Sequence, residues 1–384
     1  MQRWRRDRSG AVSVSARLPS QERWRTMTTT SGSKRRITQR QIAQLAGVSQ
    51  STVSLVVNGK AEALSRIPAA TRDRVLEVIR EAEYVADPVA RSLAGHGNHL
   101  IGVFTYEPAF PTASLDFYTS LLTGIEAEAE HLGYDLLLFT SAPVQEGKRS
   151  VFHPYSRIRL ADGCLLLGRE MEGEELERMV ASGFPFVAVG RRDTPGVPYV
   201  AVDYAAGTSA LVERAWEHGH RDFALLHVDS TGESTRDRRT GFEDALARLD
   251  SAAAARATAI AVDPADHAAA WAALRSSGAT VAFIEAPADA IALHKLAGAE
   301  GVSIPDDLSF VVLADPSRSR EGGPDFTRLS PPRARLGAES LALLSRLLDP
   351  ELDVPEHQRR LTLDCALTDG ATLVPPRPTT SASA

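Results

Sequence analysis

The sequence predicts a small all-α helix-turn-helix head followed by an α/β body of two doubly wound parallel-sheet subdomains. Between about Thr38 and Tyr84, apolar residues recur every three or four positions, as they do in short helices. From Leu100 onward, apolar segments of strand length alternate with amphipathic helical segments, which indicates parallel sheets covered on both faces. The 384 residues are enough for two or three domains.

The head and the body differ in charge. Residues 1–99 carry 17 basic and 8 acidic side chains, whereas the remaining residues carry 26 and 41. A basic head on an acidic body is typical of a nucleic-acid-binding module fused to a domain that does not bind polyanions. Cys164 and Cys365 lie far apart in apolar segments, so we expect neither a disulfide framework nor a thiolate metal site. No apolar run reaches the roughly 18 residues of a membrane-spanning helix.

Residues 1–33 are predicted to be a disordered basic extension. The segment is rich in arginine and lacks the apolar core of about 7–15 residues that a secretory signal needs. Two interpretations stay open. Either the segment adds non-specific affinity for nucleic acid, or the chain starts at Met27 and the upstream residues belong to a mis-annotated start.

Residues 34–85 are predicted to form a DNA-binding domain. Two closely crossing helices need a small residue, a turn glycine with positive φ and a branched apolar residue, and Ala43, Gly47 and Val53 have the right spacing. Ser49 is placed to cap the second helix. The N-terminal end of that helix then presents Gln50 and other polar side chains to the solvent. In such motifs this end enters the major groove.

A helical hairpin that only caps the larger domains is the alternative interpretation of the head. A hairpin of that kind needs neither the cluster of short polar side chains nor the basic flank beside it. The cluster consists of Gln50, Ser51, Thr52 and Ser54, and the flank of Lys34, Arg35, Arg36 and Arg40. We therefore favour DNA reading.

Residues 86–99 are predicted to be a hinge helix and linker, and residues 100–370 the body. Pro88 suits a helix start, and Gly95 and Gly97 suit its end. In the body we expect strands over 100–105, 134–140, 163–168, 184–190, 223–228, 257–262, 280–286 and 308–315. A helix over 333–349 and one strand over 359–369 must join one of the subdomains. Residues 371–384 are predicted to be a disordered tail.

The chain as a whole resembles the lactose/galactose repressor (LacI/GalR) family. The stretch "ITQRQIAQLAGVSQSTVSLVVNG" is similar to the family's head signature, and "TRDRVLEVIREAEYVADPVARSLAG" to the third helix and hinge helix that follow it. The resemblance continues through "VAVDYAAG", "HGHRDFALLH", "RRTGFEDAL" and "SIPDDLSFVVLAD", and so covers about 38–368. It implies a periplasmic-binding-protein-like effector domain.

The resemblance also implies which residues contact DNA. Gln50 and Ser51 match the first two base-reading positions and Leu55 the third, where the family often has arginine. Leucine cannot donate to guanine, but it can contact a thymine methyl group. Leu93 matches a hinge residue that enters the minor groove at the operator centre, where an apolar wedge kinks the duplex. A flexible linker is the alternative there. The positions that contact or orient on phosphates are Thr38, Ser49, Thr52, Asn58 and Tyr84.

Effector-binding residues are expected in the loops after the strands, because ligands of open α/β sheets lie at the carboxyl ends of the strands. Phe117 and Tyr118 could stack on a sugar ring, or belong to the core. Arg238 matches the family's ligand-binding arginine, with Arg236 and Arg239 as neighbours one or two residues away in register. Asp289 matches an acidic residue that accepts from sugar hydroxyls, or it is a helix cap.

These features predict a cytoplasmic, homodimeric transcriptional regulator, most simply a repressor. Its partners are a pseudo-palindromic double-stranded operator and a small effector, a sugar or sugar derivative. We find no P-loop, dinucleotide-binding or nucleophile-elbow motif and no metal-ligand spacing, so we expect no enzyme activity, cofactor, metal or membrane partner. The alternative is an orphan, ligand-independent DNA-binding regulator, because Ala288 replaces an asparagine that is usual in the family beside the acidic residue.

Overall fold

The computed structural model describes residues 37–58, 64, 66–82, 84, 97–108, 117–145, 148–249, 255–315 and 323–377, excluding the side chains of Asn58 and Phe117. The chain divides between residues 96 and 97 into two compact units. The expected extension 1–33 and most of the expected hinge lie outside the described residues. Among the described helices, none combines the length and apolar character needed to cross a bilayer.

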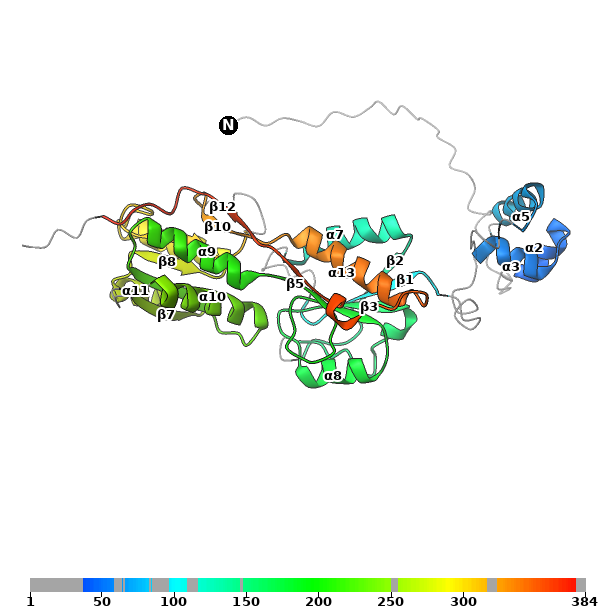
Figure 1. Ribbon diagram of the computed structural model, residues 1–384, viewed down its shortest axis with the longest axis horizontal. Coiled ribbons are helices and arrows are strands. Elements are labelled where there is room, and N and C mark those ends of the chain that lie inside the picture. Colours follow the sequence, from blue (N-terminus) through cyan, green and yellow to red (C-terminus); the bar gives the residue numbers. More distant parts are fainter. Residues whose placement is uncertain are drawn as a thin grey trace, which may run out of the picture. The chain divides into compact units, whose positions relative to one another are not determined.

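The first unit contains the three predicted helices: α2 (Gln39–Ala46), α3 (Gln50–Asn58) and α5 (Ala69–Glu81) (Figure 1). Gly47 ends α2 in the left-handed region, at φ 63° and ψ 40°, which a glycine adopts without strain. Ile42, Val53 and Val75, one from each helix, are fully buried at the centre of the head. The predicted helix-turn-helix is therefore confirmed.

The second unit contains two sheets, each with six strands among the described residues. The first sheet has the order β11-β5-β4-β3-β1-β2 and the second β12-β10-β9-β8-β6-β7. All pairs are parallel except β10 with β12. The strands of the first sheet are β1 (Leu100–Thr105), β2 (Asp135–Phe139), β3 (Gly163–Leu167), β4 (Phe186–Val189), β5 (Tyr199–Val202) and β11 (Arg360–Leu363). Those of the second are β6 (Asp222–Val228), β7 (Arg256–Val262), β8 (Val281–Ile284), β9 (Ser309–Val312), β10 (Thr327–Ser330) and β12 (Ala366–Thr368).

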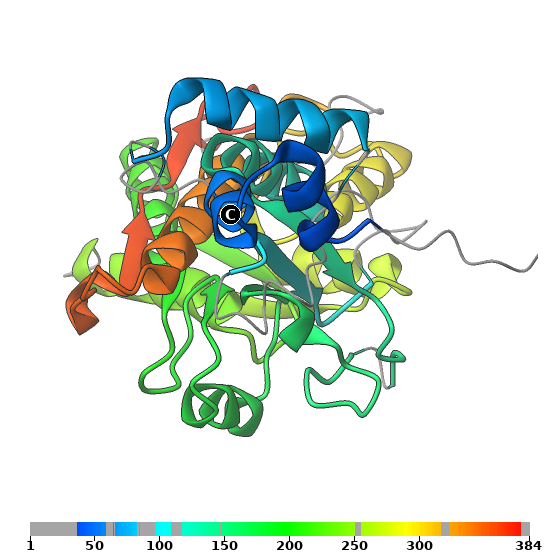
Figure 2. The same cartoon turned by 90° about the vertical axis from the view of Figure 1, so that its right-hand side faces the viewer.

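Helices cover both faces of each sheet, as predicted. On the first sheet, α7 (Phe117–Leu132) and α13 (Arg333–Leu348) lie on one face and α8 (Gly173–Ala181) on the other (Figures 1 and 2). On the second sheet, α9 (Tyr204–Glu217) and α10 (Glu233–Leu249) lie opposite α11 (His267–Ser277) and α12 (Pro287–Ala299). Two short 3-10 helices, η1 (Ile158–Leu160) and η2 (Glu356–Gln358), complete the described helical elements. The predicted fold class is confirmed.

Glycines allow two helices to pack closely against each other in each subdomain. A Cβ atom on Gly124 of α7 would lie 1.8 Å from the carbonyl oxygen of Ala334 on α13. On α10, a Cβ atom on Gly241 would lie 2.2 Å from the carbonyl oxygen of Ala205 on α9. Neither position can accept a side chain without moving the helices apart. These contacts fix the first turns of α13 and α9, which line the cavity described below.

The C-terminal part of the chain departs from the prediction. The segment 359–369, expected to form a single strand, forms two strands. Strand β11 belongs to the first sheet and β12 to the second, so the chain returns to both subdomains. Strands β5 and β10, in stretches where we expected none, place two further crossings between the sheets, from β5 to α9 and from β10 to α13. Within the described residues, the chain therefore crosses between the subdomains three times.

The expected disordered tail is wrong for residues 371–377. Thr372 is buried and donates its hydroxyl hydrogen to the carbonyl of Phe310, at 2.6 Å. The Val374 amide donates to Ser309 Oγ, at 3.2 Å, and its carbonyl lies 2.9 Å from Nε2 of His220. Leu373 is buried in the core. Polar and apolar partners from the second sheet hold this segment, which its composition alone did not indicate.

Candidate functional site

The predicted reading helix exposes a polar face at its N-terminal end. Gln50 and Ser51 are exposed, and Thr52 is half-buried. Ser49 Oγ accepts from the Thr52 amide at 3.1 Å, which confirms the predicted cap, and lies 2.7 Å from Ser51 Oγ. Leu55 is 44% exposed on the same helix. The face thus combines an amide, hydroxyls and one apolar side chain, all available for contact with a major groove.

The other expected DNA-contacting residues have different environments. Thr38 is exposed and caps α2 through a capping box with Gln41. Tyr84 is half-buried against the head core. Asn58 ends α3, but its side chain lies outside the described residues, as does the whole of Leu93. Their DNA contacts stay predictions.

A cavity of about 200 Å³ lies between the subdomains, at the carboxyl ends of strands from both sheets. Its lining comes from the segments that follow β3, β4, β5, β6, β8 and β9, together with α7, α10 and the first turn of α13. This is the place where open α/β sheets bind ligands. The apolar lining residues are Leu121, Leu167, Val189, Val202, Val228, Ala286, Pro287, Ala314 and Leu336.

Of the three neighbouring arginines, Arg238 lines the cavity. It is 8% exposed, and its guanidinium carbon lies 3.7 Å from the ring centroid of Tyr204. Nε donates to the carbonyl of Leu313 at 3.0 Å, and one terminal nitrogen donates to the carbonyl of Ser234 at 3.0 Å. Arg236 and Arg239 are about half exposed and pair with Asp193 and Glu243. The position of Arg238 supports the predicted register.

Tyr118 also lines the cavity, at the start of α7. It is 6% exposed and donates its hydroxyl hydrogen to Oε2 of Glu107, at 2.5 Å. Burial, reinforced by the neighbouring Glu107 carboxylate, raises the pKa of Tyr118 above its ordinary value. The phenol therefore stays neutral and can also accept from a ligand. Phe117 precedes it, but its side chain lies outside the described residues.

Asp289 does not line the cavity, contrary to expectation. It is 4% exposed, and its carboxylate lies 2.9 Å from Nε2 of His267 on α11. The acidic residue from this strand end that does line the cavity is Glu285, four residues earlier. Its oxygens accept from Thr235 Oγ1 at 2.6 Å and from the Val228 amide at 3.1 Å. The sequence signal for Glu285 was its place directly after β8.

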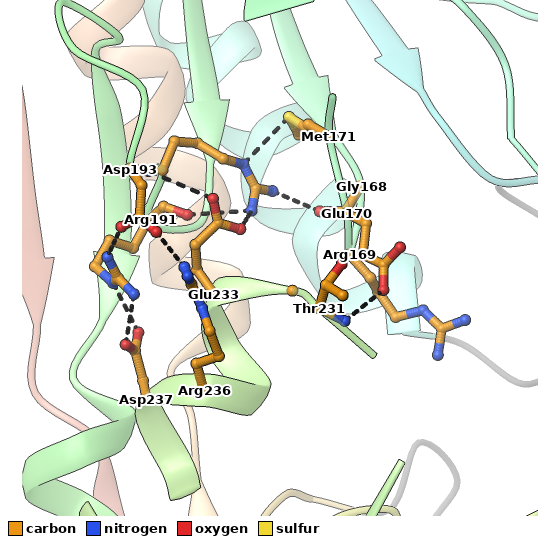
Figure 3. A network of polar contacts seen from close by, with 12 residues as sticks. Gly168, Arg169, Glu170, Met171, Arg191, Asp193, Thr231, Glu233, Arg236 and Asp237 are labelled. Atoms are coloured by element: carbon orange, nitrogen blue, oxygen red, sulfur yellow. Dashed lines mark hydrogen bonds and ion pairs between the residues drawn. The ribbon is translucent and has the colours of Figure 1, made fainter. Parts of the chain in front are cut away.

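Ion pairs cross the cleft between the subdomains, and the sequence did not predict them (Figure 3). Arg191, after β4, makes a bidentate contact with Asp237 of α10, at 2.9 and 2.7 Å. Next to it, Arg192 is 5% exposed and pairs with Glu233 at 2.8 Å. Hydrogen bonding and the charge of Asp237 raise the pKa of Arg191. Partners more than 40 residues apart in sequence cannot be paired from spacing alone.

A second polar contact closes the cleft beside these pairs. Glu170, after β3, accepts from Ser230 Oγ at 2.6 Å. It also accepts from the Thr231 amide at 3.1 Å (Figure 3). Lys148 lies 2.8 Å from the same carboxylate, and this hydrogen bond is the main reason that the pKa of Glu170 falls to about 2. Among the described residues, no group of three or more His, Cys, Asp or Glu side chains could hold a metal ion.

Models of known protein families match a segment in each of the two units. The family model described as "Bacterial regulatory proteins, lacI family" matches residues 38–87, and "Periplasmic binding protein-like domain" matches 212–373. The HTH-type transcriptional regulator CelR of Thermobifida fusca is 25% identical over 332 residues, which cover 84% of this chain and 95% of CelR.

Solved structures show the same fold. The lac repressor dimer bound to operator and the anti-inducer ONPF has a TM-score of 0.70 at 22% identity, covering 88% of this chain and 100% of the repressor chain. A complex of the transcriptional regulator CelR with cellobiose has a TM-score of 0.58 at 24% identity, again covering 88% and 100%.

Proposed function

We infer that this chain, which belongs to the LacI family of bacterial regulatory proteins, is a sequence-specific DNA-binding transcriptional repressor whose operator binding a small ligand controls. The observation that carries the ligand control is the cavity between the subdomains, lined from both sheets and containing the buried Arg238. The effector we propose is a sugar or sugar derivative. CelR of Thermobifida fusca is similar to this chain over most of both chains, and a transcriptional regulator CelR has been solved in complex with cellobiose.

The proposed mechanism is linkage between cleft closure and operator binding. A ligand in the cavity contacts both subdomains and so favours one closure state, by as much as its affinities for the two states differ. In a homodimer on a pseudo-palindromic operator, closure changes whether the two hinge segments, 86–99, can pair in the minor groove with Leu93 at the centre. Both signs, induction and co-repression, are compatible with this linkage.

We further propose where the protein acts and which of its residues contact DNA and ligand. The protein acts in the cytoplasm, where its operator is, and has no catalytic step of its own. Residues 34–85 read DNA, 86–99 form the hinge, and 100–370 bind the effector and dimerise. Base contacts come from Gln50, Ser51 and Leu55, and phosphate contacts from Thr38, Ser49, Thr52, Asn58 and Tyr84. In the effector domain, Phe117, Tyr118 and Arg238 contact the ligand.

Binding-site selection with the full-length protein tests the DNA half of the proposal. It should return a pseudo-palindrome with thymine at the position that Leu55 reads, because the exposed leucine can contact a methyl group but cannot donate to guanine. Leu55→Arg should move the preference at that position toward guanine, whereas the wild type selecting guanine there would refute this role for Leu55.

A melting-temperature screen against sugars tests the ligand half. A ligand that binds only the native state raises the melting temperature. Each hit should also change the affinity for the selected operator. If the protein selects a specific operator but no sugar changes its melting temperature or its operator affinity, it is an orphan regulator. This is the alternative that follows from Ala288, which replaces an asparagine that is usual in the family.

A further inference from the structure

Two short charged segments face each other across the cleft with complementary signs. Residues 191–193 follow β4 in the first subdomain and consist of two arginines and an aspartate. Each of their side chains has a partner of opposite sign on the first turns of α10 in the second subdomain (Figure 3). The pairs are Arg191 with Asp237, Arg192 with Glu233 and Asp193 with Arg236. Complementary charges of this kind fix how two surfaces meet.

Helix α10 presents its two acidic groups on one side. Glu233 and Asp237 are one turn apart, so their side chains project from the same face of the helix. Glu233 lies in the first turn, where the positive end of the helix dipole favours a carboxylate. Arg191 then contacts Asp237 through both Nε and a terminal nitrogen, at 2.9 and 2.7 Å. This paired geometry holds two surfaces in one relative orientation, because a planar guanidinium has to meet both carboxylate oxygens.

Arg192 is held in position by its own subdomain. Its guanidinium donates to the carbonyls of Gly168 at 2.6 Å and Arg191 at 3.1 Å, and the residue is 5% exposed. Its contact with Glu233, at 2.8 Å, reaches the second subdomain. Because the guanidinium is already ordered, pairing with Glu233 costs little side-chain entropy. Opening of the cleft would leave this largely buried charge without its carboxylate, which is unfavourable.

The backbones of the two subdomains also approach closely beside the ion pairs. Gly232, the residue before α10, is buried, and a Cβ atom at its position would lie 2.8 Å from the carbonyl oxygen of Arg169. A side chain at this position would therefore push the two subdomains apart. Next to this contact, Glu170 of the first subdomain accepts from Ser230 and Thr231 of the second. Steric fit and charge thus favour the same closed arrangement.

The contacts described above join protein groups to one another, so they stabilise the closed cleft whether or not the cavity holds a ligand. Arg191, Arg192 and Asp237 also line that cavity. We propose that residues 191–193, Gly232 and the first turns of α10 form a latch that keeps the cleft closed before any ligand binds. This inference goes beyond the proposed function, which does not specify the closure state of the ligand-free protein.

The distance between two spin labels, one on each subdomain, measures closure in the ligand-free, full-length protein. Glu177→Cys on α8 and Ala272→Cys on α11 provide exposed labelling positions. The background carries Cys365→Ser, whereas Cys164 is fully buried and out of reach of the label. Dilution with unlabelled chain leaves one labelled chain in each dimer. We expect one narrow distance distribution for the wild-type latch.

Two kinds of variant should open the cleft by different physical means. Arg191→Gln and Asp237→Asn each remove the bidentate ion pair, and should raise the population of a second distance by about tenfold, as for close charge pairs at an interface. The double variant should have less than the combined effect, because both changes break the same pair. Gly232→Ala adds a methyl group and no charge, and should populate the same second distance because the subdomains can no longer approach fully.

Matched controls lie elsewhere in the second subdomain. Arg239→Gln and Glu243→Gln remove an exposed ion pair within α10. Gly298→Ala adds a methyl group on α12, where no other part of the described chain lies within 4 Å. All three should keep the wild-type distance, and the melting temperature reports whether each variant folds. Added NaCl should shift the wild type toward the second distance and Arg191→Gln less so, because screening weakens partly exposed pairs.

The outcomes separate the latch from the proposed function. Distances in Arg191→Gln and Asp237→Asn equal to that in Arg239→Gln would overturn the latch. A wild type that already has the distance of Gly232→Ala would overturn it too, because the ligand-free cleft would then be open. Operator affinity of the same variants tests the linkage between closure and operator binding. Labels that move while operator affinity stays constant would uphold the latch and contradict that linkage.

Discussion

The head and the cleft present their functional side chains in opposite ways. In the head, Gln50 and Ser51 are exposed, and the side-chain hydrogen bonds of Ser49 reach no further than three residues along the chain. In the cleft, Arg238 is buried and contacts Leu313 and Glu285, which are 75 and 47 residues away. Exposed groups with local partners can change without disturbing the fold. Substitution of a buried group with distant partners is expected to change both the stability of the fold and the function.

The largest effect that this comparison predicts is that of Arg238→Ala. The change leaves Glu285 in a largely buried position without its cation, and removal of one partner from a buried ion pair costs about 3–5 kcal/mol. We expect a lower melting temperature of the effector domain and loss of the ligand response, while operator binding persists below that temperature. The exposed neighbour Arg239→Ala is the control and should change stability by less than about 0.5 kcal/mol. An unaltered ligand response would show that Arg238 does not contact the effector.

Acid should destabilise the effector domain through His220. Burial lowers the pKa of this side chain to about 4, so in the unfolded chain, where it titrates near 6.5, it takes up a proton first. Its contribution is complete above pH 6.5 and is lost as the pH falls toward 4, amounting to about 2 kcal/mol between pH 7 and pH 5. Denaturant unfolding at both pH values should show this loss in the wild type and a smaller one in His220→Gln. The same pH dependence in both proteins would contradict the assignment.

A smaller effect, confined to recognition, is expected from Gln50→Ala. An exposed side chain that pairs with a base should cost about 1–3 kcal/mol of discrimination at one operator position when it is removed. Melting of the head should not change, which is the contrast with Arg238. Gln44→Ala, exposed on α2, is the control and should leave base preference intact. Equal loss of affinity on every sequence would mean that Gln50 does not read a base.

The smallest effect is expected from Ser49→Ala, which removes the cap of α3. Loss of an N-cap typically costs about 1 kcal/mol, because the Thr52 amide loses its side-chain acceptor. Thermal unfolding of the head should show this loss, and Ser51→Ala, which caps nothing, should not. If both variants melt alike, the cap does not stabilise the head.

Prediction from sequence was most successful where structure follows local rules. The spacing of Ala43, Gly47 and Val53 was enough for the helical head, and all eight predicted body strands are present, because buried parallel strands are continuous apolar runs. It failed where a segment depends on partners elsewhere. Strand β5 follows a turn-rich stretch, and residues 371–377 have a polar composition, yet both are held by the sheets beside them.

The sequence by itself determined the order of the domains and the outward polar face of α3, since both depend on periodicity and on chain order. It also predicted a ligand site at the carboxyl ends of strands, but not the full set of strands that line the cavity. Only the tertiary structure decided which charged side chains line the cavity. It replaced Asp289 with Glu285, paired Arg191 and Arg192 with carboxylates across the cleft, and brought Arg333 to the same cavity as Arg238. The physical reason is that the sum of charges in a cavity depends on side chains brought together from distant parts of the chain, and no local pattern encodes that sum.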